Sequence, residues 1–384
     1  MCFKSIDLIF IACLWIFALI IRIKLFPIES ADYYGFLEQW MDEIRSLGGF
    51  KSLGTEISNY STPYMFLMCL VSGCDNSLYA LKSISVVFDY VGCVAVFLIV
   101  YELSASTFNA TLGMAAYLLC PTFFIDSAYW CQCDTIYTAF ILLALLFFYK
   151  GKSFPCMIFT GVAFGFKLQT LFILPFFVIM YLKKKNINLI DFVFIPLVYL
   201  IMQLPAVIFG RPLKDLCLIY FDQSNYYPWG TLQYPNIYAL LDETIESTHH
   251  MDEITGAGTF MAIILMGFLA YYICRKNIKI TTDISVATAL FSVALCVYSL
   301  PHMHDRYGIL IDMLAIIYAV LRPKKLPVAI GFMLISLLTF MPYLIAVSIF
   351  DIRTLAVGQL VLIVYVGYDL YKLITAQESI QATI

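Results

Sequence analysis

Two histidines, an aspartate and an arginine stand together in residues 301–307, Pro-His-Met-His-Asp-Arg-Tyr. The segment lies between two long apolar runs, in a chain with only 4 histidines and 13% charged residues. Placing a charged group in lipid costs roughly 2–3 kcal/mol even on lenient scales. We therefore expect His302, His304 and Arg306 at an interface or in a polar cavity. There they could bind a phosphate or pyrophosphate, with Asp305 orienting either residue type.

Two other interpretations of this segment stay open. His-x-His with Asp305 could bind a metal ion, because extended backbone places both rings on one side. The segment could also serve only as an interfacial anchor. The phosphate interpretation is favoured over both.

Asp32 follows the first apolar run and precedes an amphipathic stretch that carries Trp40 and Ile44 on one face. A carboxylate beside aromatic rings just outside the membrane could act as the general base for an acceptor hydroxyl. The alternative is a helix N-cap for the stretch from Tyr33 onward, and the two roles can coexist.

Two further segments carry charge at helix junctions. Asp126 and Asp134 flank Ser-Ala-Tyr-Trp-Cys-Gln-Cys, where they could position a sugar or acceptor, bind metal, or cap helices. Lys167 and Gln169 lie between two short apolar runs. A lysine there must snorkel, pair, or line a cavity, and we favour a cavity-lining role beside a phosphate or carboxylate.

The composition is that of a polytopic membrane protein. Of its 384 residues, 62% are hydrophobic, against roughly 45–50% in soluble domains. Its net charge of −3 argues against a nucleic-acid partner. About twelve transmembrane helices are expected in an all-α fold. Their predicted positions are near residues 6–26, 78–101, 108–124, 134–149, 154–167, 168–182, 188–209, 259–274, 284–300, 308–321, 327–349 and 354–374.

Basic clusters follow alternate runs, at residues 150–152, 183–185, 275–279 and 322–325. Because cytoplasmic loops are enriched in Lys and Arg, these clusters and both termini are expected in the cytoplasm. The run 62–73 is too short to span, and we expect an interfacial helix on the outer surface. Arg22 and Lys24 oppose the rule, so they should snorkel or bind an anion.

One domain is expected over residues 1–384. It comprises a first helix (1–27), an outer loop with juxtamembrane helices (28–77), helices 2–7 (78–209), a large outer loop (210–258) and helices 8–12 (259–384). The outer segments are rich in Tyr, Trp, Asn and Asp, which suits sugar stacking. An aromatic belt at the membrane interface is the simpler explanation of the same composition.

Five motifs occur in order: Ser-x-Asp-Tyr (30–33), Tyr-Trp-Cys-Gln-Cys-Asp-Thr-Ile-Tyr-Thr (129–138), Phe-Lys-Leu-Gln (166–169), Tyr-Pro-Asn-Ile-Tyr-Ala-Leu-Leu (234–241) and His-Met-His-Asp-Arg-Tyr (302–307). Together they resemble bacterial multi-pass glycosyltransferases related to the second mannosyltransferase of GPI-anchor synthesis, within the GT-C superfamily. The resemblance covers roughly residues 28–310. Cys131 stands where the family usually has Gly, a small-for-small exchange that should keep the turn. Asp305 stands where the family has Glu.

The resemblance implies a GT-C fold, an inverting mechanism and a polyprenyl-phosphate sugar donor, usually with no metal. It gives Asp32 the catalytic position, and it implies that His302, His304, Arg306 and Lys167 meet the donor phosphate. The residues expected to bind sugar or acceptor are Tyr33, Asp126, Trp130, Gln132, Asp134, Gln169, Tyr234 and Asn236. No cofactor is expected, although a divalent metal stays conceivable.

The expected function is therefore transfer of a hexose, with mannose the first choice, to a glycan or lipid-linked acceptor. The active site would face the outside of the cell (inner or plasma) membrane. A flippase or transporter for lipid-linked oligosaccharides, and an O-antigen-type polymerase or ligase, are the alternatives. A transporter needs a site near the midplane, often within inverted repeats, and no repeat is evident.

Overall fold

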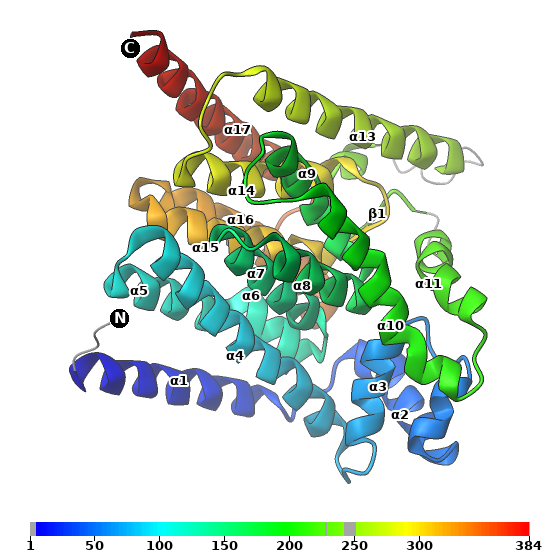
Figure 1. Cartoon of the computed structure of the whole chain (residues 1–384). Helices are drawn as coiled ribbons and strands as arrows, with labels where there is room; N and C mark the ends of the chain where they lie inside the picture. Colours follow the sequence, from blue (N-terminus) through cyan, green and yellow to red (C-terminus); the bar gives the residue numbers. More distant parts are fainter. Residues whose placement is uncertain (1–4, 227–228, 242–250, 384) are drawn as a thin grey trace. The chain divides into compact units, whose positions relative to one another are not determined.

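The computed structural model describes residues 5–226, 229–241 and 251–383, and these are almost entirely helical (Figure 1). Its two strands, β1 (Thr231–Leu232) and β2 (Met303–His304), have two residues each and pair in parallel. The prediction of an all-α, multi-pass membrane protein is confirmed. Residues 1–4, 227–228, 242–250 and 384 lie outside the described residues, and these include part of the predicted large loop.

The chain divides into two compact units, and each is described by itself. The first consists of Met1–Thr170 and Leu189–Tyr226. Its elements are α1 (Ser5–Leu25), η1 (Tyr33–Leu37), α2 (Glu38–Ser46), η2 (Gly49–Gly54), α3 (Thr62–Val71), α4 (Ser77–Ser104), α5 (Thr107–Leu118), α6 (Pro121–Phe124), η3 (Ile125–Trp130), α7 (Asp134–Tyr149), α8 (Ser153–Phe166), η5 (Leu189–Val193), α10 (Phe194–Ile208) and α11 (Leu213–Tyr226).

The core of the first unit is built on α4 and α7, which pack against each other and against α5 and α8 respectively. The helix α8 also packs on α10. Gly161 allows this contact, because a Cβ at that position would lie 2.8 Å from the Cβ of Val198. Small residues permit such close helix approach where lipid supplies no hydrophobic driving force.

The second unit consists of Leu171–Asn188 and Tyr227–Ile384. Besides the strands it contains α9 (Leu174–Leu182), η6 (Ile237–Leu240), α13 (Met251–Arg275), α14 (Thr282–Ser299), η7 (Asp305–Gly308), α15 (Ile309–Leu321), η8 (Pro323–Lys325), α16 (Leu326–Ile345) and α17 (Ile352–Thr383). Here α14 packs on α15 and α17, and α15 packs on α16. The helix η4 (Leu168–Ile173) lies at the boundary between the units.

Every predicted apolar run contains helix, but the number of membrane spans is not fixed by this. Seven of the described helices are long and apolar enough to cross a membrane, or eight if one bent pair counts as a single span. Shorter apolar helices such as α7 and α8 fall below that length. The predicted count of about twelve spans, like the GT-C fold, therefore stays a prediction.

The third apolar run was expected to be one helix, and this is wrong. It breaks after α5 and resumes as α6 and η3, with a bend of 42° between the two parts. Pro121 is the first residue of α6. Since proline has no backbone N–H and disfavours helical backbone at the residue before it, the helix ends at Leu118 and restarts at Pro121. The break places η3 next to the first predicted loop.

The first predicted loop is helical, as expected, and holds η1, α2, η2 and α3. In α2 the apolar face buries Met41 and Ile44, and Trp40 is half-buried beside them. The short run 62–73 forms α3, whose Tyr64 and Met68 are buried inside the unit. Its helical state is thus confirmed, while its place at a membrane surface stays a prediction.

Candidate active site

The side chain of Asp32 is held from across the first unit rather than by its own helix. Asp32 occupies the N-cap position of η1, but its carboxylate makes no capping hydrogen bond there. Its Oδ2 atom accepts a hydrogen bond from Trp130 Nε1 at 2.9 Å and another from Gln132 Nε2. The helix-cap interpretation of Asp32 is therefore wrong, while its predicted role as general base stays a prediction.

Ser30 performs the local capping instead and attaches the loop to the same partner segment. Its Oγ atom accepts a hydrogen bond from the backbone N–H of Tyr33 at 3.2 Å. The same hydroxyl donates to the backbone carbonyl of Trp130 at 2.6 Å. Two residues of the Ser-x-Asp-Tyr motif thus bind one tryptophan, which restricts where Asp32 can point.

The partner segment is a π-helical turn, η3, that ends in a left-handed residue. Cys131 follows it with φ +69°, and the N–H of Gln132 turns back to donate to the carbonyl of Asp126 at 2.9 Å. Left-handed backbone costs a residue with a Cβ roughly 1–2 kcal/mol, and glycine avoids that cost. The turn predicted at Cys131 therefore forms. Single π turns are frequent at functional sites.

Gln132 is fixed at both its backbone and its side chain. Its carbonyl accepts a hydrogen bond from Ser85 Oγ at 2.7 Å, and its Oε1 atom accepts one from the Tyr60 hydroxyl at 3.4 Å. These contacts direct its Nε2 toward Asp32. Because Gln132 is 5% exposed, its amide is an internal positioning group for the carboxylate.

Lys167 and Asp134 form a buried ion pair of 2.8 Å in the same unit. Lys167 lies at the extended break between α8 and η4, which matches the predicted junction, and Gln169 follows on η4. Of the two partners predicted for Lys167, the observed one is a carboxylate. Its Nζ atom also lies 5.6 Å from the ring centroid of Tyr60, which links the pair to the residues around Asp32.

Aromatic side chains surround this group. The Tyr60 ring lies 5.5 Å from that of Trp40 and 5.0 Å from that of Tyr64, between centroids. Tyr33 is 5% exposed, and burial, followed by the charge of Glu38, raises its pKa to about 12. It therefore stays protonated at neutral pH and can donate a hydrogen bond, but it cannot act as a base.

The two cysteines of this segment are packing groups rather than nucleophiles. Burial raises the pKa of Cys131 to about 12 and that of Cys133 to about 11. A thiol attacks as its thiolate, so neither side chain has appreciable nucleophilic character near neutral pH. Cys133, not Asp134, occupies the N-cap of α7, and Asp126 lies buried within η3. The helix-cap alternative for both aspartates is thus wrong.

Arg22 was expected to snorkel or to bind an external anion, and this is wrong. It is fully buried, and its Nε atom donates to Asp89 Oδ2 at 2.6 Å. Ser127, which lies on η3, donates to the same oxygen at 2.6 Å. A buried arginine needs a counter-charge within the protein, and Asp89 supplies it. The pair thereby joins α1 and α4 to the turn that carries Trp130.

Lys82 is a second charged residue of α4 that the sequence analysis did not single out. It is fully buried, and its Nζ atom donates to the carbonyls of Leu25, Phe26 and Ile28. It thus satisfies carbonyls at and beyond the end of α1, just before Asp32. Lys82 and Asp89 are seven positions apart in one apolar run. A charge within such a run is itself the signal that could have identified both.

In the second unit the segment 301–307 is held by the Tyr-Pro-Asn-Ile-Tyr motif. Strand β2 pairs with β1, and the N–H of His302, which has φ +59°, donates to the carbonyl of Gly230 at 2.9 Å. The Asn236 amide donates to the carbonyls of Gly230 and Leu300, and its oxygen accepts from two backbone N–H groups. Asn236 is a scaffold residue here, and its predicted sugar contact stays a prediction.

Asp305 contacts Arg306 within the segment 301–307, as predicted for a residue that orients the arginine. Asp305 Oδ1 accepts from the N–H of Arg306 at 2.9 Å and lies 3.5 Å from its guanidinium. The His304 ring packs 5.3 Å from that of Tyr307. Tyr234 is buried and accepts a hydrogen bond from Gln359 at 3.0 Å, and burial raises its pKa.

Five predicted site residues therefore lie together in the first unit: Asp32, Trp130, Gln132, Asp134 and Lys167. The second unit contains Tyr234, Asn236, His302, His304 and Arg306. Within the described part of the chain, no three His, Cys, Asp or Glu side chains are grouped to hold a metal ion.

Comparison with known proteins adds no assignment. No protein-family model matches the chain, and no curated protein matches it either. The resemblance to GT-C glycosyltransferases therefore rests on the ordered motifs and enters the argument as a proposal.

Proposed function

We propose that this protein is an integral-membrane glycosyltransferase of the GT-C type with Asp32 as its general base. It transfers a hexose, with mannose the first choice, from a polyprenyl-phosphate carrier to a glycan or lipid-linked acceptor. One observation carries the proposal: Oδ2 of Asp32 accepts hydrogen bonds from both Trp130 and Gln132. The three residues come from two motifs to which the family resemblance gives catalytic and sugar-binding roles.

The proposed reaction is a single displacement. Asp32 accepts the proton of an acceptor hydroxyl while that oxygen forms a bond to C1 of the hexose. The bond between C1 and the phosphate oxygen breaks, and the polyprenyl phosphate leaves with the electron pair. The anomeric configuration is inverted. Trp130 and Gln132 hold the carboxylate in one orientation, which lowers the entropic cost of reaching the reactive geometry.

The surroundings of Asp32 support a sugar as the group that is handled. Trp40, Tyr60 and Tyr64 form a contiguous set of rings, and rings pack on the apolar faces of pyranoses. The Asp134–Lys167 pair adds a charged hydrogen-bonding group beside Tyr60. This combination goes beyond a simple aromatic belt, because Tyr60 contacts both Gln132, which holds Asp32, and Lys167, which pairs with the buried Asp134.

The donor phosphate is assigned to His302, His304 and Arg306. Arg306 carries the planar donor fork that suits phosphate oxygens, and Asp305 orients it. The buried Nδ1 atom of His302 has no hydrogen-bond partner among the described residues, which leaves it capacity for a ligand. Lys167 contributes to phosphate binding only if its pair with Asp134 opens.

The assigned membrane side follows from the basic clusters. Their alternation supports cytoplasmic termini and an active site on the extracytoplasmic face of the cell membrane. In a bacterium, this places the reaction in the synthesis of envelope polysaccharide.

The test is an assay of the purified protein with synthetic polyprenyl-phosphate hexoses, in which released polyprenyl phosphate is measured. Release that depends on acceptor and on Asp32 supports the proposal. A flippase would move lipid-linked glycan across vesicles without release, and a polymerase or ligase would use a diphosphate-linked glycan instead. No release with any hexose would refute the assigned reaction.

A further inference from the structure

Positive charge in the second unit is concentrated at one end. The unit has twelve Lys and Arg residues. Nine of them lie where α9, α13 and α15 end and where α14 and α16 begin, and a tenth lies in the C-terminal part of α17. The two exceptions are Arg306 and Arg353. We call these ten residues the basic end: Lys183, Lys184, Lys185, Arg275, Lys276, Lys279, Arg322, Lys324, Lys325 and Lys372. The acidic residues that accompany them in ion pairs are Asp283, Asp369 and Glu378.

Side-chain contacts join several of the helices that carry the basic end. Lys183 donates to the backbone carbonyl of Lys276 at 2.9 Å, and Lys276 pairs with Glu378 at 3.0 Å. These contacts join α9, α13 and α17. Asp369 lies nine residues before Glu378 on α17, which corresponds to about 14 Å along the helix and to its opposite face, so the two clusters lie on two sides of α17.

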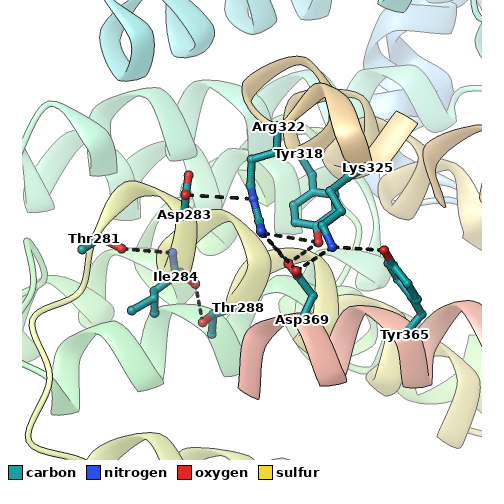
Figure 2. Close-up of polar contacts among 9 residues, drawn as sticks. All are labelled: Thr281, Asp283, Ile284, Thr288, Tyr318, Arg322, Lys325, Tyr365 and Asp369. Atoms are coloured by element: carbon teal, nitrogen blue, oxygen red, sulfur yellow. Dashed lines mark hydrogen bonds and ion pairs between the residues drawn. The ribbon is translucent and has the colours of Figure 1, made fainter. Parts of the chain in front are cut away.

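Asp369 organises the other half of this surface (Figure 2). Its carboxylate accepts hydrogen bonds from both terminal nitrogens of Arg322 and from the Tyr318 hydroxyl, and it lies 2.6 Å from Lys325 Nζ. Arg322 also lies 3.9 Å from Asp283 at the start of α14. Arg322 and Lys325 are thus balanced by Asp369 and Asp283, and the excess positive charge of the basic end comes from the cations outside this cluster.

Tyrosine rings accompany the cations throughout the basic end. Five cation–π contacts, at 4.5 to 5.7 Å from the ring centroid, pair Lys372 with Tyr368, Lys325 with Tyr365, Arg322 with Tyr318, Lys276 with Tyr272, and Arg275 with Tyr271. Tyrosine is enriched at the level of lipid headgroups, where its ring is apolar and its hydroxyl is wet. Such pairing of cations with tyrosine rings is typical of residues at headgroup depth.

We propose that the basic end is a binding surface for the phosphate headgroups of anionic phospholipids. The basic end contains ten cations and only three acidic residues, and tyrosine rings accompany five of these cations. A clustered basic surface of this kind attracts anionic headgroups over zwitterionic ones. Lys184, Lys279 and Lys324 are exposed and are the direct contacts, while Arg322 and Lys325 hold the surface together through Asp369. The surface includes none of the residues assigned to glycosyl transfer.

The experiment uses the full-length protein in nanodiscs of phosphatidylcholine that contain spin-labelled phosphatidylglycerol or spin-labelled phosphatidylcholine. Motionally restricted lipid is measured by electron paramagnetic resonance. The triple variant Lys184→Gln/Lys279→Gln/Lys324→Gln should lose most of the preference for phosphatidylglycerol, by about fivefold or more if each charge acts near the surface. High salt should reduce the wild-type preference in the same way.

The matched control is Lys51→Gln/Lys214→Gln/Arg353→Gln, which removes three exposed charges outside the basic end. It should keep the wild-type preference. Equal restriction of both lipids by the wild-type protein, or an equal loss in both triple variants, would overturn the proposal. Because the readout is lipid restriction, the result is independent of any glycosyl transfer.

Discussion

The indole Nε1 of Trp130 donates a hydrogen bond to Oδ2 of Asp32 at 2.9 Å, although 98 positions separate the two residues. The contact joins the first loop to the π-helical turn η3 and gives the carboxylate a fixed direction. The carboxylate of Asp32 does not cap the helix that follows it, because Ser30 accepts the hydrogen bond from the N–H of Tyr33 instead. The Asp32 side chain is therefore positioned by Trp130 and Gln132 and not by a capping role.

Removing the indole donor should slow transfer more than it weakens binding. In Trp130→Phe the ring remains but the hydrogen bond to Asp32 is lost. Since one oriented hydrogen bond to a charged group contributes about 1.5–3 kcal/mol, we expect kcat to fall by about 10- to 100-fold. The KM values for donor and acceptor should change little. Steady-state kinetics at saturating substrate checks this, and an unchanged kcat would show that the orientation of Asp32 is irrelevant.

Breaking the Asp134–Lys167 pair should destabilise the first unit. Removing one partner leaves the other charge buried, which typically costs about 3–5 kcal/mol. Asp134→Asn and Lys167→Met should therefore each lower the melting temperature of the detergent-solubilised protein. The double variant should lose less than the sum of the two, because neither charge is then stranded. Strictly additive losses would mean that the two side chains do not interact in the folded protein.

Arg306→Gln should weaken binding of the sugar donor and leave binding of the acceptor unchanged. The variant retains hydrogen-bonding capacity but lacks the charge and fork of the guanidinium. We expect the apparent KM for the polyprenyl-phosphate sugar to rise about 10- to 100-fold. His304→Ala should have the same direction of effect. Arg353→Gln, in the same unit, is the matched control, and an equal rise there would remove the phosphate assignment.

Thiol labelling should separate Cys131 and Cys133 from the exposed cysteines. Burial raises both pKa values, to about 12 and about 11, so at pH 8 the thiolate form is scarce and the atoms are covered. A maleimide at that pH should modify Cys74 and Cys217, which are exposed, and spare the buried pair. Reactivity of Cys131 should appear only as the pH approaches its pKa or after denaturation. Peptide mapping by mass spectrometry would detect early modification, which would contradict the buried turn.

Much of the helix content was predictable because apolar runs and polar breaks are local signals. The helix break before Pro121 was not predicted, because the residues on both sides of it are apolar. The proline itself is a local signal for such a break. The short run 62–73 forms the helix α3, and its separation from the membrane spans by length stays a prediction. Span number could not be derived, since α7 and α8 are shorter than a membrane requires but lie among longer helices.

The partners of the site residues could not be predicted from the sequence. Asp32 and Trp130 meet where η3 turns back at Cys131, and the residues around Cys131 give no local indication of what this turn contacts. Arg22 was interpreted as exposed because its counter-charge, Asp89, lies 67 positions away on another helix. The distance between two residues along the chain does not show whether they pair in the folded protein. Lys167 and Asp134 could therefore each be identified as a charged residue beside apolar runs, but not as an ion pair.

The most direct test of the account compares Asp32→Asn with Asp42→Asn at saturating polyprenyl-phosphate hexose and acceptor. The first substitution keeps the size of the side chain and its ability to contact Trp130, but the resulting amide cannot accept the proton. Asp42 is exposed on α2 and has no assigned role, so its variant controls for loss of a nearby negative charge. We predict that Asp32→Asn lowers release of polyprenyl phosphate by about 10²- to 10⁴-fold, while Asp42→Asn retains wild-type turnover. Near-normal turnover in a folded Asp32→Asn protein would contradict the central claim.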